Sequence, residues 1–323
     1  MTLVVCPNLA IDRMIAAAAI VPGGLMRCRA LRTQAGGKGA NVLRALRALG
    51  GGGVLAGFAA GRGGRLIAEL ADDEGLDLEL VVTDGEARVS TVVLEDDGSV
   101  TRLYELGPQI GADDERALLD LVGGRAAGAR DWAVVSGAAP PGASPGFYAT
   151  LVRDAREAGY RVLLDATGEQ LAGALAERPE LVKVNLAEAC SAVGDPSARC
   201  RDDRTGAPED LAAEGVELSR RLVAAGAVSA IVTLGAAGAV GVIAAEVWHV
   251  HTRPVAAVNP VGSGDCFAAG LILASGRGED TGAALRLAAG AAAANATSPY
   301  NGHVDPAFAR ALTDDVHAVR HAM

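Results

Sequence analysis

Short runs rich in β-branched residues alternate with longer Ala- and Leu-rich stretches from about residue 35 onward. The runs have the length of buried strands, and the stretches have the length of helices that cover a core. This alternation predicts a mostly parallel sheet with helices on both faces. In a sheet of that kind, ligands bind beside the C-terminal ends of the strands. The pattern therefore limits both the fold and the place where a site can form.

The alternation divides the chain into separate elements. The expected strands are 3–6, 54–58, 133–136, 161–165, 181–184 and 230–234. The expected helices are 40–49, 65–74, 114–127, 145–158 and 211–225. The polar segment 194–210 contains proline and glycine, and we interpret it as a surface loop.

Two segments, 13–34 and 88–106, break the alternation. Each indicates a pair of strands without a helix, joined at a turn signal that contains glycine. The two segments are alike in character, so they could pair into one small sheet that projects from the core. Such a sheet would make a lid or a dimer surface. The alternative is an ordinary antiparallel edge of the main sheet.

Charge and composition exclude some partners. The chain has a net charge of −10, a pI near 5.0 and no basic block, so nucleic acid is not expected as a partner. The N-terminus has no basic region, and the apolar stretch 14–21 is too short to span a bilayer. Five scattered cysteines without Cys-x-x-Cys spacing argue against a disulfide framework and a zinc site. These features predict a cytoplasmic protein that does not bind membranes.

The sequence Gly262-Ser263-Gly264-Asp265 directly precedes an Ala- and Leu-rich helical stretch. A glycine turn that opens a helix presents unpaired N–H groups and the positive end of the helix dipole to an anion. A carboxylate in the first turn can also take a proton from a hydroxyl. Phosphoryl transfer to an alcohol needs both features. A loop with a simple N-cap is the alternative, since Ser and Asp favour that position.

A second glycine-rich run, Gly36-Gly37-Lys38-Gly39, leads into a helix that carries Asn41 in its first turn. Glycines allow close backbone approach, and the lysine and amide can bind a phosphorylated or polyhydroxylated small molecule. Only two of the 29 basic residues are lysines, and Lys38 is one of them. Asp12 follows the first expected strand, where a carboxylate can accept two sugar hydroxyls. A turn exposed to solvent is the alternative for both segments.

The other lysine, Lys183, begins a segment in which Asn185 and Glu188 stand at a helix start. Lys183 could face nucleotide phosphates, while Asn185 and Glu188 could hold Mg²⁺ through water, because this ion gives up its hydration shell reluctantly. A capping box between Asn185 and Glu188 is compatible with that role. The turn from Thr233 to Gly238 ends another strand and suits nucleotide contact.

Together these motifs resemble the PfkB or ribokinase-like family of sugar kinases, and the resemblance covers nearly the whole chain. Segments 259–265, 136–137 and 302–304 are most similar to the branch that contains tagatose-6-phosphate kinase and 1-phosphofructokinase. The resemblance implies a ribokinase-like three-layer α/β/α sandwich with a mostly parallel central sheet and a small β-sheet lid. It divides the chain into a core of residues 1–12, 35–87 and 107–323 and a lid of residues 13–34 and 88–106, with a homodimer formed through the lid.

The resemblance also implies a role for each motif. Asp265 would be the base, and the backbone N–H groups of Gly262, Ser263, Gly264 and Asp265 would bind the γ-phosphoryl group. The sugar would be held by Asp12, Gly37 and Asn41. The phosphate of the sugar would lie near Lys38, Arg88 and Ser136, with Arg27 reaching it from the lid of a partner subunit. ATP would be bound by Lys183, Asn185, Thr233, Gly235 and Gly238, and Mg²⁺ by Glu188 through water.

Three positions depart from the branch pattern, and all lie on the expected acceptor side. Ser90 stands where the branch often has Asn, Val92 where 1-phosphofructokinases often have Lys, and Ala138 where a Ser is usual. The nucleotide-side motifs show no comparable loss of polar groups. The chemistry is therefore better defined than the acceptor.

From these features we expect an ATP- and Mg²⁺-dependent kinase of a ketohexose phosphate: tagatose 6-phosphate, fructose 1-phosphate or fructose 6-phosphate. One alternative is a kinase of an unphosphorylated sugar or a nucleoside. Another, from outside the enzymes, is a phosphosugar-binding regulatory protein.

Overall fold

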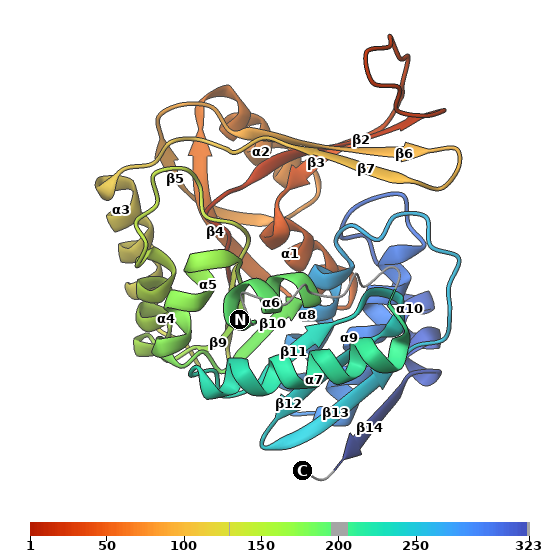
Figure 1. Ribbon diagram of the computed structural model, residues 1–323. Helices are drawn as coiled ribbons and strands as arrows, with labels where there is room; N and C mark the ends of the chain where they lie inside the picture. Colours follow the sequence, from red (N-terminus) through yellow and green to blue (C-terminus); the bar gives the residue numbers. More distant parts are fainter. Residues whose placement is uncertain (129, 195–205, 322–323) are drawn as a thin grey trace.

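The computed structural model describes residues 1–128, 130–194 and 206–321, and its main element is a ten-stranded sheet (Figure 1). In spatial order the strands are β14 (His317–His321), β13 (Glu246–His251), β12 (Ala239–Ile243), β11 (Ala230–Thr233), β10 (Leu181–Asn185), β9 (Arg161–Asp165), β8 (Trp132–Ser136), β1 (Thr2–Val5), β4 (Gly53–Ala60) and β5 (Asp77–Thr83). Neighbouring strands from β5 to β11 are parallel, and β12, β13 and β14 add an antiparallel edge.

Helices cover both faces of this sheet, and each face has its own apolar core. One core is formed with α1 (Lys38–Ala48), α2 (Gly61–Asp73), α8 (Ser263–Arg277), α9 (Thr281–Ala296) and α10 (Pro306–Asp314). The other is formed with α3 (Ala112–Gly123), α4 (Phe147–Glu157), α5 (Gly168–Ala174), α6 (Leu186–Val193) and α7 (Pro208–Ala224). Alternation within a strand decides the face: Leu3 and Val5 enter one core and Val4 enters the other. The three-layer prediction is confirmed.

Segments far apart in the chain form a second sheet of four strands, seen at the top of Figure 1. Its spatial order is β3 (Arg29–Gly36), β2 (Ala10–Ala17), β6 (Arg88–Glu95) and β7 (Val100–Tyr104). The central pair β2 and β6 is parallel, and the outer pairs are antiparallel. The two unusual segments of the sequence therefore pair with each other rather than with an edge of the large sheet.

The small sheet begins earlier than the sequence indicates. The strand β1 ends at Val5, and after a short turn the chain enters β2 at Ala10. Asp12 therefore lies inside β2, where it faces Gln34 and Ser90 across the sheet, and not at the end of β1. The turn at residues 7–9 is too short to be separated from a strand end by pattern alone.

Other expectations need smaller corrections. The helix expected to reach residue 127 ends at Gly123, and the expected loop 194–210 gives way to α7 at Pro208, while its residues 195–205 lie outside the described part. Cys6, Cys28 and Cys266 are free thiols, but Cys190 is bonded in a disulfide, which the cysteine spacing did not predict. Of the helices described, none is both long and apolar enough to cross a bilayer.

Candidate active site

The order of the large sheet reverses at β1, which lies between β4 and β8. Ligands in open α/β sheets bind at such a reversal, outside the C-terminal ends of the strands. Ser136, Asp165 and Asn185 are the last residues of β8, β9 and β10, so they lie along this edge. The topology therefore places polar side chains from neighbouring strands at one location.

The helix α8 begins at this edge, with Gly262 as its N-cap and Ser263 as its first residue. The Ser263 N–H donates to Pro260 O at 3.1 Å, and the Ser263 hydroxyl accepts a bond from Asn295 at 3.0 Å. Within the described residues, no acceptor pairs with the N–H groups of Gly264 and Asp265. These two amides, at the positive end of the helix dipole, are available to an anion. From the sequence we expected the Ser263 amide to bind the anion as well, but this amide already donates to Pro260 O.

The carboxylate of Asp265 is buried at the start of α8, with only 6% of the residue exposed. Burial is the main reason that its pKa is raised to about 7, and the negative charge of Asp165 raises it further. Lys183, Lys38 and a hydrogen bond from Asn41 oppose this shift. A carboxylate with a pKa near the working pH is well suited to accept a proton.

Asp165 ties the two lysines of the chain together at the end of β9. Its Oδ1 accepts from Lys38 Nζ at 2.7 Å, and its Oδ2 accepts from Lys183 Nζ. Burial alone would raise the pKa of Asp165, but the two ammonium groups lower it, so the residue stays ionised. Lys183 also donates to the carbonyl of Gly264 at 3.1 Å, beneath the first turn of α8. It lies within β10, as the expected strand 181–184 indicates, and it is buried.

The residues expected to hold the sugar lie close to Asp265 and to Asp12. Asn41 Nδ2 donates to Asp265 Oδ2 at 2.8 Å, which joins α1 to α8. Asp12 Oδ2 accepts from Asn301 Nδ2 at 3.0 Å, and the Gly37 backbone also bonds to its carboxylate. Burial raises the pKa of Asp12. Two buried carboxylates, one on α8 and one on β2, thus each accept a hydrogen bond from an asparagine amide.

The groups expected near an acceptor phosphate differ in their placement. Arg88 begins β6, and its guanidinium donates to Asn8 O at 3.0 and 3.2 Å. Ser136 is buried, and its hydroxyl has no partner among the described residues. Arg27 lies in the exposed segment between β2 and β3, and no described contact joins it to the other residues of the site.

On the other side of Asp165, Asn185 and Glu188 form a capping box at the start of α6. Glu188 Oε2 accepts from the Asn185 N–H at 2.9 Å, and Glu188 Oε1 accepts from Lys38 Nζ at 3.0 Å. Each carboxylate oxygen of Glu188 accepts one hydrogen bond from the protein and keeps a second lone pair. Such oxygens are better suited to accept hydrogen bonds from the water shell of Mg²⁺ than to coordinate the ion directly. No group of three or more metal-binding side chains is found in the described ranges.

The turn expected to contact the nucleotide follows β11. Thr233 ends this strand, and its hydroxyl donates to Val184 O at 3.4 Å, so it lies beside the end of β10. Gly235 and Gly238 bound the 3-10 turn η2 (Gly235–Ala237). The turn thus lies on the side of Asn185 away from β8 and Ser136.

Three residues of the site have no counterpart in the sequence analysis. Asp165 could have been found, because it is the last residue of an expected strand and so lies at the ligand edge of the sheet. Arg44 is buried within α1, although a charged residue in an amphipathic helix is usually exposed. Asn301 lies in an irregular segment, and its contact with Asp12 spans most of the chain.

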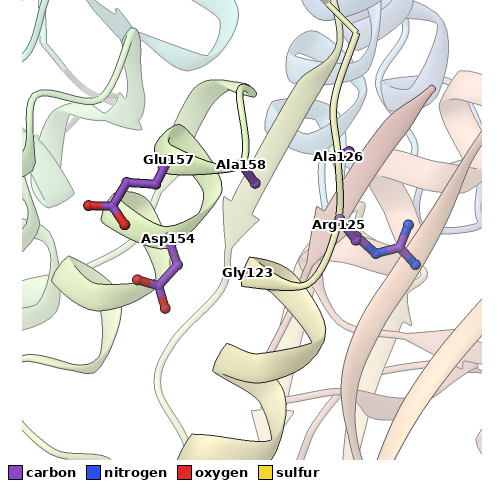
Figure 2. Close-up of a pocket in the computed structure, with 6 residues that line it drawn as sticks. All are labelled: Gly123, Arg125, Ala126, Asp154, Glu157 and Ala158. Carbon is purple, nitrogen blue, oxygen red and sulfur yellow. The ribbon is translucent and has the colours of Figure 1, made fainter.

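A cavity of about 490 Å³ lies elsewhere (Figure 2). It is lined by Gly123, Arg125, Ala126, Asp154, Glu157 and Ala158, at the C-terminal ends of α3 and α4. Those ends precede β8 and β9, so the cavity is at the edge of the sheet opposite to Asp265. It contributes no residue to the site described above.

The turn at Gly262 depends on glycine, which gives a first prediction. Gly262 has a φ of 86°, and a Cβ placed there would lie 2.7 Å from Gly302 N. We expect Gly262→Ala to destabilise the fold by about 1–3 kcal/mol and to lower kcat by displacing the turn. Gly98→Ala is the matched control, since Gly98 has a φ of 87° and open space around it. Urea unfolding and steady-state rates measure both effects, and equal kcat values for the two variants would contradict the prediction.

The unpaired amides of α8, the buried carboxylate and the nearby lysines define the protein as an α/β enzyme that transfers a phosphoryl group to an alcohol. Comparison with known proteins agrees. The family model described as pfkB family carbohydrate kinase matches residues 1–307, and the chain belongs to this family.

The chain is similar to proteins named 1-phosphofructokinase from two organisms. It is 32% identical to that of Rhodobacter capsulatus over 87% of this chain and 85% of the relative. It is 31% identical to that of Haloferax volcanii over 98% and 97%, respectively. Among solved structures, phosphofructokinase-2 from Escherichia coli in complex with fructose-6-phosphate superposes with a TM-score of 0.83, at 25% identity and 97% coverage of each chain.

Proposed function

We propose that the protein transfers the γ-phosphoryl group of ATP to a hydroxyl of a ketohexose phosphate and forms the bisphosphate. The observation that carries the proposal is the place of Asp265: a buried carboxylate with a pKa of about 7, next to two unpaired amides at a helix N-terminus. The similarity to proteins named 1-phosphofructokinase supports the class of acceptor.

In this proposal Asp265 accepts the proton of the acceptor hydroxyl. The hydroxyl oxygen forms a bond to the γ-phosphorus, the bond from that phosphorus to the β,γ-bridging oxygen breaks, and ADP leaves. The N–H groups of Gly264 and Asp265 stabilise the charge on the transferred group. Lys183 holds the carbonyl of Gly264 and so keeps this turn in place. Asn185, Thr233, Gly235 and Gly238 would contact the nucleotide.

Mg²⁺ would be held through water by Glu188, whose oxygens each keep one lone pair. When bound, the ion offsets the charge of the phosphate oxygens.

For the acceptor, Asp12, Gly37 and Asn41 would bind sugar hydroxyls, and Lys38, Arg88 and Ser136 would lie near the sugar phosphate. The Ser136 hydroxyl is buried and has no partner in the part of the chain that the structure describes, and such a group favours a polar ligand. Ser90, one of the departures from the branch, lies opposite Asp12 across β2 and β6. This neighbourhood would influence which ketohexose phosphate is accepted.

The test is ADP release measured across a panel of acceptors. We expect turnover with fructose 1-phosphate, fructose 6-phosphate or tagatose 6-phosphate, and kcat/KM at least tenfold lower with free ketohexoses and nucleosides. A preference for an unphosphorylated acceptor would overturn the proposed substrate. Binding of sugar phosphates without ATP turnover would instead indicate a regulatory protein.

The raised pKa of Asp265 predicts a pH dependence. Because only the ionised carboxylate can accept a proton, kcat/KM should rise with pH through about 7 and then level off. Burial of the carboxylate, together with Asp165, Lys183, Lys38 and Asn41, sets this midpoint. Rates measured from pH 5.5 to 9 at constant ionic strength test the prediction. A profile that is flat across this range would contradict it.

We also propose that the small sheet closes over the site as a lid and that two copies join through it. Exposed apolar side chains gather there, including Leu25 at 89%, Leu103 at 58% and Leu106 at 79% exposure. Exposed patches of this kind are typical of interaction surfaces. Leu103→Asp should give a monomer in sedimentation velocity, whereas Val82→Asp, the same kind of change at an exposed apolar residue on β5, should not. A monomeric wild-type protein at micromolar concentration would contradict this proposal.

A further inference from the structure

Arg44, on α1, is a buried arginine that the chemistry above does not use. Its side chain is 8% exposed, and its Nε donates to Glu74 Oε2 at 2.5 Å. Its other bonds go to Asn41 Oδ1 at 3.0 Å, Asn301 O at 3.2 Å and Ala35 O at 2.6 Å. A guanidinium is costly to bury, and here four acceptors from different segments satisfy it.

The contact with Asn41 fixes which way its amide group points. An arginine has only donors, so the amide atom that faces Arg44 is the oxygen, and the NH₂ group must turn to the other side. That side is Asp265, whose Oδ2 accepts from Asn41 Nδ2 at 2.8 Å. This hydrogen bond lowers the pKa of Asp265 and so favours the ionised form. If the amide were reversed, its oxygen would face the carboxylate and would favour the protonated form.

The contact with Asn301 extends to the second carboxylate. Asn301 O accepts from Arg44 and also from Gln34 Nε2 at 2.8 Å, so the backbone of this residue is held on two sides. Its side chain donates to Asp12 Oδ2 at 3.0 Å. Arg44 therefore contacts both residues whose amides donate to these carboxylates: Asn41 donates to Asp265, and Asn301 donates to Asp12.

Glu74 completes the arrangement from the end of α2. Its Oε2 accepts from Arg44, and its Oε1 accepts from the Ala35 N–H at 3.1 Å. Arg44 in turn donates to Ala35 O, so the ion pair binds both backbone groups of Ala35. Ala35 immediately precedes Gly36 and Gly37, the backbone next to Asp12. The pair thus anchors this glycine turn as well.

We propose that Arg44, held by Glu74, is a positioning residue that orients the Asn41 amide toward Asp265 and aligns Asp265 with Asp12. The inference rests on the proposed function in that Asp265 is taken as the base. Besides Asn41, the titratable groups that interact with Asp265 are Lys38 on α1, Lys183 on β10, Asp165 on β9, Cys266 on α8, Cys6 directly after β1 and Tyr104 on β7. The proposal leaves their charges unchanged, and in Arg44→Lys the charge at position 44 is kept as well, so a change in the titration of Asp265 in that variant reports on the amide.

The test compares variants of the full-length protein. Arg44→Met with Glu74→Met removes both charges, so that neither is left buried alone. Arg44→Lys keeps the charge without the planar fork and serves as a milder second variant if the double variant does not fold. Arg125→Met with Glu79→Met is the control, because it removes an ion pair at the opposite edge of the sheet.

We expect kcat of the Arg44 and Glu74 variant to fall about 10- to 100-fold, with KM for ATP changed less than about threefold. The acid limb of kcat/KM should move up by roughly half a pH unit to one unit, the size expected for one lost hydrogen bond. The Lys variant should lie between this variant and the wild type, and the control should match the wild type in both readouts. A lower melting temperature with unchanged kcat and acid limb would overturn the inference.

An infrared titration separates this inference from the proposed function. The carboxylic C=O band that disappears in Asp265→Asn belongs to Asp265, and its midpoint can be followed without any substrate. The midpoint should rise in the Arg44 and Glu74 variant. If the wild type transferred no phosphoryl group, the proposed function would fail while this titration still tested Arg44. An unchanged midpoint would overturn the inference whatever the activity.

Discussion

Asp265→Asn should lose about 10²- to 10⁴-fold in kcat while the fold and nucleotide binding stay close to those of the wild type. The amide has the size of the carboxylate, but it cannot accept the proton of the acceptor hydroxyl. Asn41 donates to Asp265 and can still donate to the remaining side-chain oxygen. The loss should therefore appear in kcat and in the pH profile, which should lose its limb near pH 7.

The matched control is Asp280→Asn, which makes the same change at the N-cap of α9, away from the site. Asn caps a helix as well as Asp does, so this variant should retain wild-type activity and stability. A residual rate above roughly a tenth of wild type in Asp265→Asn would show that another group acts as the base.

Asp165→Asn should have the second large effect, on stability as well as on activity. The substitution removes the anion that Lys38 and Lys183 share and leaves Lys183 buried without a charged partner. Breaking a buried ion pair in this way costs about 3–5 kcal/mol. Lys38 would keep its ion pair with Glu188, and Asp265 would keep the attraction of both lysines but lose the repulsion of Asp165. Its pKa should then fall, and the acid limb of kcat/KM should move below pH 7.

Urea unfolding and rate measurements from pH 5 to 9 test both parts of this prediction. Asp113→Asn serves as the control, because it removes an exposed ion pair with Arg116 that contributes little to stability. If Asp165→Asn were as stable as the control, or if its acid limb moved to higher pH, the role given to Asp165 would be wrong.

Patterns in the sequence were sufficient to predict the three layers of the fold and the positions of most central strands. A short continuous apolar run such as the one in Arg161–Asp165 is a local feature of a buried strand, so it can be recognised without a structure. The antiparallel edge of β12, β13 and β14 was missed, because no α-helix separates β11, β12 and β13, and because β14 pairs with β13 only after the three helices α8, α9 and α10. The place of Asp12 inside β2 was missed for a similar reason, since the turn before it is very short.

The site could be predicted only where its residues belong to short, continuous motifs. Asp265, Lys38 and Asn41 stand in such motifs, and they meet at one edge of the sheet. The contacts of Arg44 and Asn301 depend on how distant segments pack, and a periodic pattern of hydrophobic residues does not predict them. The pKa of Asp265 could not be predicted either, because burial and the charge of Asp165 arise only in the fold.

The central claim is tested most directly by ³¹P NMR of the wild-type protein with ATP, Mg²⁺ and a ketohexose monophosphate. We predict that a second phosphomonoester resonance appears on the sugar in step with ADP, that both depend on the acceptor, and that Asp265→Asn slows both by at least about 10²-fold. Release of inorganic phosphate with no new sugar resonance, or full transfer by Asp265→Asn, would contradict the claim.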